Sequence, residues 1–123
     1  MNTAERIASA NEVIAQFTDT LAQYDAALAL RAHHIDGVND AYLIRTSEGV
    51  YTKQEAGKVW GCGALFATRY TRAEAKRLAP TTRNGRGDVG VPVNVWEALA
   101  TDRAAIAAQI ETITKLRDEL TAK

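Results

Sequence analysis

Three small groups of residues in this chain are of types that carry chemistry: a single cysteine, a pair of histidines and a cluster of basic side chains. Cys62 stands between two glycines, close to Trp60. A cysteine nucleophile needs a neighbouring base or a positive environment to form its thiolate. Nothing in the sequence places a histidine near Cys62, so we interpret it as a small packed residue at a bulge.

The two histidines, His33 and His34, are adjacent near the predicted end of a helix. Neighbouring helical positions point about 100° apart, so the two rings are poorly placed to chelate one metal ion. Cationic groups at a helix C-terminus are also favoured by the helix dipole. General acid–base catalysis needs converging titratable groups, and the carboxylates lie mostly on predicted solvent faces. We therefore expect no metal, no cofactor, no catalytic residue and no enzymatic activity.

The basic cluster in the middle of the chain is the sharper candidate for a binding role. Arg72 and Lys76 are four positions apart on a predicted short helix, and Arg69 precedes Arg72 by three. Tyr70 and Trp60 would add stacking surface. Such a patch suits an acidic protein surface or nucleic-acid phosphates, although a solvated helix face beside a loop gives the same pattern. The predicted partner-binding residues are Arg69, Arg72, Lys76, Arg77, Arg83 and Arg86.

The distribution of charge supports this focus on the middle of the chain. The 123 residues hold 15 basic and 15 acidic side chains, so the total charge favours no class of partner. Residues 1–40 hold two basic and six acidic side chains, whereas residues 41–88 hold nine basic and four acidic. Residues 89–123 hold four basic and five acidic. Positive charge is therefore concentrated between two acidic ends.

Two long amphipathic helices are predicted to position this middle segment. Apolar residues recur at spacings of three and four at both ends of the chain, which gives each helix one apolar stripe. The first stripe consists of Ile7, Ala10, Ile14, Phe17, Leu21, Tyr24 and Leu28. The second consists of Trp96, Leu99, Ile106, Ile110, Ile113 and Leu120. We expect helices over about residues 3–33 and 95–121, paired as an antiparallel hairpin with the middle segment at its tip.

The middle segment changes its hydrophobic period. Runs of β-forming residues predict strands at 41–46, 50–54, 58–70 (with a bulge) and 89–93, and a short helix at 71–79. Pro92 lacks a backbone donor, so the last strand should lie at a sheet edge. Capping-box spacings that predict helix starts occur at Asn2/Glu5, Thr71/Glu74 and Asn94/Glu97.

The sequence thus predicts an α+β fold in one domain, residues 1–123, built from a helical segment 1–38, an α+β insert 39–93 and a C-terminal helix 94–123. Apolar residues beside the two stripes widen them, which predicts self-association into a homodimer. These residues are Val13, Leu30, Ile35 and Leu116. A single cysteine and the lack of a signal-like or membrane-length apolar run predict a cytoplasmic protein that does not enter a membrane.

Part of the middle segment resembles a small module of bacteriophage accessory proteins, in which a YVIR…G.Y hairpin precedes an F.TR.EA helix and a short V.V strand. The matching residues are Tyr42-Leu43-Ile44-Arg45, Gly49-Val50-Tyr51 and Phe66 through Ala75. The resemblance covers about half of the chain and excludes the long helices. It implies a phage or prophage origin and brings no catalytic residue. Small phage proteins of that kind often bind a host protein, anti-CRISPR proteins among them.

Together these observations predict a non-enzymatic, phage-encoded interaction protein that inhibits or modulates a host protein complex in the host cytoplasm. One alternative is a nucleic-acid-binding protein that uses the basic tip. A structural or assembly protein of a virion is another alternative, because heptad helices serve that role equally well.

Overall fold

The computed structural model describes residues 2–33, 41–83 and 87–122. The elements in chain order are α1 (Thr3–Ala29), η1 (Leu30–His33), β1 (Tyr42–Ser47), β2 (Val50–Glu55), β3 (Lys58–Cys62), α2 (Arg72–Leu78), η2 (Ala79–Thr81), β4 (Val91–Asn94) and α3 (Val95–Thr121). This order confirms the α+β class, with a long helix at each end and a four-stranded antiparallel sheet and a short helix between them. Three residues named above, His34, Ile35 and Arg86, lie outside the described ranges.

Each of the three α-helices starts at a side-chain cap that the spacing predicted. The Asn2 side chain accepts the Glu5 N–H at 2.8 Å and donates to the Glu5 carboxylate at 3.1 Å. Thr71 accepts a first-turn N–H of α2 at 3.2 Å, and Asn94 accepts two first-turn N–H groups of α3. These bonds satisfy donors that a helix start leaves free.

The sheet has the strand order β3-β2-β1-β4, and all of its pairs are antiparallel. The first three strands form the predicted meander, and β4 lies at an edge as Pro92 indicated. In the turn between β2 and β3, Ala56 and Gly57 have φ of 52° and 78°, the left-handed pair that a tight two-residue hairpin requires.

Two strand predictions were wrong in extent. The third strand ends at Cys62, because the Ala64 N–H bonds to a carboxylate of α3 rather than to β2, and the chain turns away from the sheet there. It returns at Thr68, whose N–H bonds to the Thr52 carbonyl of β2 at 3.0 Å, and at Tyr70, which forms a single bridge with Tyr42. The last strand begins two residues later than predicted, since Val89 pairs with Arg83 outside the sheet.

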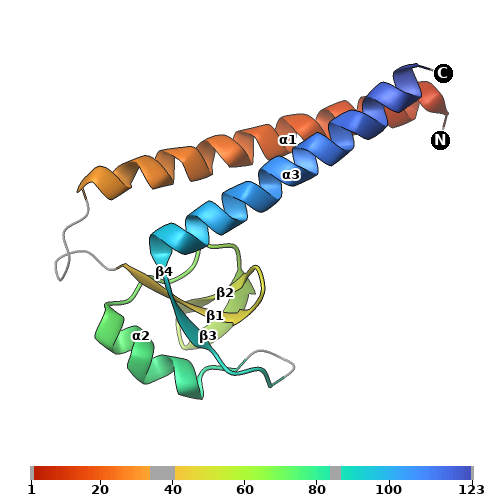
Figure 1. The fold of residues 1–123 in the computed structure, drawn as a ribbon. Coiled ribbons are helices and arrows are strands. Elements are labelled where there is room, and N and C mark those ends of the chain that lie inside the picture. Colours follow the sequence, from red (N-terminus) through yellow and green to blue (C-terminus); the bar gives the residue numbers. More distant parts are fainter. Residues whose placement is uncertain (1, 34–40, 84–86, 123) are drawn as a thin grey trace.

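The two faces of the sheet pack against different helices (Figure 1). On one face, Leu43 of β1 packs with Val95 and Leu99 of α3, and all three are fully buried. On the other face, Ile44 packs with Ala75 and the neighbouring small residues of α2 and η2. Because successive strand residues point to opposite faces, β1 contributes to both cores.

Helices α1 and α3 lie side by side and run in opposite directions, so both ends of the chain lie at the same end of the molecule (Figure 1). Arg103 of α3 pairs with Asp25 of α1, and the Arg117 guanidinium donates to the Asn11 side chain at 3.1 Å. Within the described ranges, no helix has an apolar stretch of the length needed to cross a membrane. Below, α1 and α3 are called the helix pair, and residues 41–83 with 87–94 the sheet region.

Burial along the helix pair is uneven. Tyr24 is the only described residue of α1 that is buried, and the buried residues of α3 all lie in its first two turns. Farther from the sheet, the stripe residues of both helices are half-buried. The two stripes face each other, but two helices alone leave one side of each stripe in contact with water.

Candidate binding surfaces

Helix α2 presents the first candidate surface. Its inner side is anchored by Ala75, which is fully buried against the sheet. Its outer side carries Arg72, Lys76 and Arg77, which are all exposed. Arg72 and Lys76 lie one helical turn apart, and no described carboxylate forms an ion pair with any of the three. The result is a group of three exposed cations without an ion-pair partner among the described residues, on a helix anchored by its buried side, which we call the α2 surface.

The other predicted basic residues are placed less uniformly. Arg69 is exposed and lies just before the cap of α2, so it adjoins the α2 surface. Arg83 is exposed but turns back on its own segment, where its guanidinium contacts the Pro80 carbonyl and donates to the Thr82 carbonyl at 3.2 Å. Arg86 lies outside the described residues. The structure therefore groups four of the six predicted residues around α2.

The predicted stacking role of Tyr70 is wrong. Its ring is only 7% exposed, and its hydroxyl donates to the Gln54 side chain at 3.2 Å. Tyr70 is a core residue because its segment pairs with Tyr42 and closes the second core. Trp60 is 44% exposed, but it lies on the edge strand β3 rather than on α2. An aromatic contact does exist at the α2 surface, where the Arg72 guanidinium lies 6.0 Å from the ring centre of Tyr42.

Cys62 ends β3 and is half-buried. Burial raises the pKa of its thiol above the usual value, and the smaller effect of Lys53 acts in the opposite direction. The thiolate is therefore scarcer at neutral pH than for a free cysteine. Among the described residues, no group of three Cys, His, Asp or Glu side chains is arranged to hold a metal ion.

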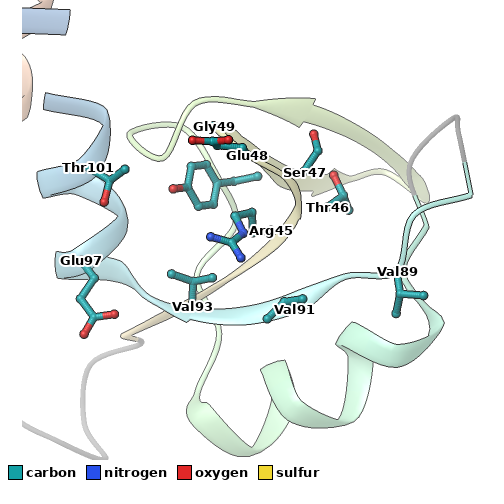
Figure 2. A pocket seen from close by; sticks show the side chains of 11 residues that line it. Arg45, Thr46, Ser47, Glu48, Gly49, Val89, Val91, Val93, Glu97 and Thr101 are labelled. Carbon is teal, nitrogen blue, oxygen red and sulfur yellow. The ribbon is translucent and has the colours of Figure 1, made fainter. Parts of the chain in front are cut away.

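A second candidate surface lies on the opposite face of the sheet and was not predicted from the sequence. It is a hollow of about 420 Å³ between the β1–β2 turn, β4 and the first turns of α3 (Figure 2). Its lining residues are Arg45, Thr46, Ser47, Glu48, Gly49, Tyr51, Val89, Val91, Val93, Glu97 and Thr101. We call it the Arg45 hollow, because Arg45 extends into its middle (Figure 2).

Among the described residues, the lining of the Arg45 hollow holds one guanidinium, that of Arg45, and two carboxylates, those of Glu48 and Glu97. Strand register places Arg45 opposite Tyr51 on β2 and opposite Val91 on β4. Arg45 is half-buried, and no described residue forms an ion pair or a hydrogen bond with its side chain. Burial raises the pKa of the Tyr51 phenol, as does Asp102, while Arg45 lowers it. Tyr51 therefore keeps its proton at neutral pH and can donate a hydrogen bond.

A polar junction joins the sheet region to the helix pair. One carboxylate oxygen of Asp102 accepts the Tyr24 hydroxyl at 2.9 Å and the Ala64 N–H at 2.8 Å. Burial, followed by the hydrogen bond to Asp102, raises the pKa of Tyr24 to about 12. A Cβ on Gly63 would lie 2.9 Å from the Tyr24 hydroxyl, so only glycine fits there without a shift. The junction connects α1, α3 and the segment after β3.

Comparison of the chain with protein-family models, with curated proteins and with solved structures gave no match.

Proposed function

We propose that the protein is a non-enzymatic interaction module that recognises an acidic surface of a partner protein through the α2 surface. The observation that carries this proposal is the row of exposed cations at Arg72, Lys76 and Arg77, which have no carboxylate partner among the described residues. Cations that are not neutralised within their own chain steer and orient an oppositely charged partner. The buried base of α2 keeps their spacing fixed, which lowers the entropy lost on binding.

The partner that fits this surface best is a protein. Tyr70 is buried, α2 carries no aromatic residue, and the half-buried Tyr42 ring lies under the Arg72 guanidinium, so the α2 surface offers single-stranded bases no well-exposed ring for stacking. Contact with nucleic-acid phosphates would rest on charge alone. Binding of an oligonucleotide is accordingly an outcome that the experiment below can reveal.

We further infer that the chain comes from a phage or prophage and acts on a host complex in the cytoplasm, as anti-CRISPR proteins do. The resemblance of residues 42–51 and 66–75 to the phage accessory module supports this origin. In this proposal the helix pair forms a hairpin-shaped shaft and the sheet region forms its recognition tip. A role in virion assembly would instead use the shaft as the main contact surface.

The experiment reverses two charges on α2. The double variant Arg72→Glu with Lys76→Glu should bind a purified host partner at least about tenfold more weakly, or about 1.4 kcal/mol. The matched control, Arg6→Glu with Arg31→Glu, makes the same charge change at exposed positions of α1 and η1 and should bind normally. Full affinity in the α2 double variant contradicts the proposal.

A second experiment measures the binding of a fluorescent oligonucleotide at two salt concentrations. Tight binding would identify a nucleic acid, and not a protein, as the partner of the α2 surface.

We also propose that two copies of the chain associate through the helix pair. A shallow hollow of about 480 Å³ lies between α1 and α3, and its lining residues are Val13, Phe17, Ala108, Gln109, Thr112 and Ile113. None of these is charged, and residues 13–18 and 104–110 contain no charged residue. Two such faces meet without like-charge repulsion. Leu116, which borders this part of α3, leaves 54% of its surface exposed.

The size of this face suits a stable dimer. A 27-residue helix is about 40 Å long, and two adjacent helices are about 20 Å wide, which gives an upper limit of about 800 Å² per protomer, because the first turns of α3 pack against the sheet. A typical specific interface buries a similar area on each partner.

Light scattering should therefore give a molar mass of about twice 13.3 kDa, the mass of one chain. Ala108→Glu should yield a monomer, whereas Ala73→Glu on the exposed side of α2 should not, and a monomeric wild-type protein at about 50 µM contradicts the dimer.

A further inference from the structure

We propose that the Arg45 hollow is a second binding site, which takes a carboxylate group attached to a short apolar body. The hollow opens on the sheet face that packs against α3, whereas the α2 surface lies beyond the opposite face. The two sites are therefore separate, and this inference does not depend on the function proposed for α2.

The first argument is the position of Arg45 in its strand. The residue two positions earlier, Leu43, points to the same face and is fully buried. Its cross-strand neighbours Tyr51, Val91 and Val93 are aromatic or aliphatic. A guanidinium on such a face loses part of its hydration, and no described residue replaces it with an ion pair or a hydrogen bond. Desolvation without compensation is costly, and a bound anion would supply the missing partner.

The second argument concerns the chemical class of that anion. A planar guanidinium matches a carboxylate through two parallel hydrogen bonds. Among the described residues, Arg45 is the one cation that lines the hollow, while Glu48 and Glu97 also line it, so a dianion such as phosphate would meet strong repulsion from the two carboxylates. A carboxylate carries one charge, so it meets half of this repulsion while its two oxygens still match the guanidinium. Thr101 of α3 also lines the hollow and adds a hydroxyl donor (Figure 2).

The third argument is the wall formed by three valines. Val89, Val91 and Val93 lie along one side of the hollow, and the first two are 50% and 46% exposed (Figure 2). Exposed aliphatic groups next to a free guanidinium favour a ligand that is apolar behind its charged end. The volume of about 420 Å³ falls within the range of small-ligand sites, about 300–1,000 Å³.

Two sources can present this chemistry, a free short-chain carboxylic acid and the C-terminal carboxylate of a polypeptide. Butyrate serves as the probe for the first source. The tripeptide Ala-Val-Val with a free C-terminus serves for the second, with its C-terminal amide as the uncharged match. Phosphate and butylamine test whether a dianion or a cation is accepted.

The experiment follows backbone amide shifts by NMR during titration. Butyrate or the free tripeptide should shift the amides of Gly49, Val91 and Thr101, with dissociation constants of about millimolar magnitude. Arg45→Gln should abolish these shifts, and the control Arg69→Gln should preserve them. Shifts that persist in Arg45→Gln, or that phosphate produces equally, overturn the proposal. Absence of any shift with both carboxylate probes also overturns it.

A stability measurement separates a binding role from a structural one. Arg45→Met keeps the length of the side chain and removes its charge. If the Arg45 guanidinium serves only to bind a ligand, the Arg45→Met variant should melt at the same temperature as the wild type or at a higher one. A fall of several degrees would show that Arg45 supports the fold by itself, and it would overturn the argument that its charge lacks a partner.

Discussion

The sheet region and the outer half of the helix pair contain similar apolar residues but bury them to different extents. In the sheet region, strands and helices enclose side chains from two sides, and Leu43 and Ile44 are 0% and 1% exposed. In the outer half of the helix pair, Ile14 and Ile113 remain half-buried although they lie on the facing stripes. The difference shows that apolar spacing alone does not make a core, because a stripe needs neighbours on both flanks.

The largest effect is expected from truncating the core of the sheet region. Leu43→Ala should lower the free energy of unfolding by about 3 kcal/mol, because it removes buried methyl groups and leaves a cavity between β1 and α3. Ile113→Ala, in the outer helix pair, should cost about 1 kcal/mol in dilute protein. Urea denaturation of the two variants and the wild type measures both losses. Equal losses would show that the outer helices are as well buried in solution as the sheet, which would break the comparison and favour the dimer.

The junction between the two regions should have the next largest effect. Asp102→Ala removes the acceptor shared by the Tyr24 hydroxyl and the Ala64 N–H, so two partly buried donors lose their partner. We expect a loss of about 2 kcal/mol in urea denaturation. Asp118→Ala is the control, because that carboxylate is exposed and its one ion pair among the described residues is with the neighbouring Arg117. A loss as small as that of the control would mean that the two regions hold together without this junction.

Tyr24 should also make stability depend on pH in the alkaline range. Its pKa is about 12 in the folded chain and 10.0 for an unperturbed tyrosine, so the unfolded chain releases this proton first. The protonated Tyr24 hydroxyl therefore contributes its full share of the free energy of unfolding below pH 10, and this contribution decreases as the pH rises from 10 to 12. Tyr24→Phe should melt lower at neutral pH and lose less stability over that interval than the wild type. Parallel curves for the two proteins would contradict the raised pKa of Tyr24 in the folded chain.

The parts of the fold that were predicted from the sequence are those that depend on local signals. Capping spacings located all three helix starts, and the end of α3 at Thr121 followed from the length of its stripe. The edge position of β4 followed from the missing donor of Pro92. Each of these depends on residues close together in the chain, for which propensity and spacing are informative.

The features that were not predicted depend on contacts between distant segments. The chain leaves the sheet after Cys62 because of Asp102, which lies 38 positions from Ala64 in the sequence. The sequence does contain a signal for the role of Asp102, because the apolar stripe of α3 is interrupted between Leu99 and Ile106, and Asp102 lies in that gap. The sequence gives a weaker signal for the Arg45 hollow. Only the observed register shows that Arg45 shares a face with the β4 valines, because a shift of one residue would turn it to the other face.

The two edges of the sheet differ in their ability to accept another strand. On β4, the Val95 N–H bonds to the Ala41 carbonyl, so by alternation the N of Pro92 faces outward, where it has no proton to donate. The nearby Gly90 N–H is already bound to the Thr82 carbonyl. Edge strand β3 has no proline, and its exposed side chains include Val59 and Trp60. Strand addition to this sheet is therefore confined to β3, so two copies joined edge to edge leave no donor-rich sheet edge for a third strand.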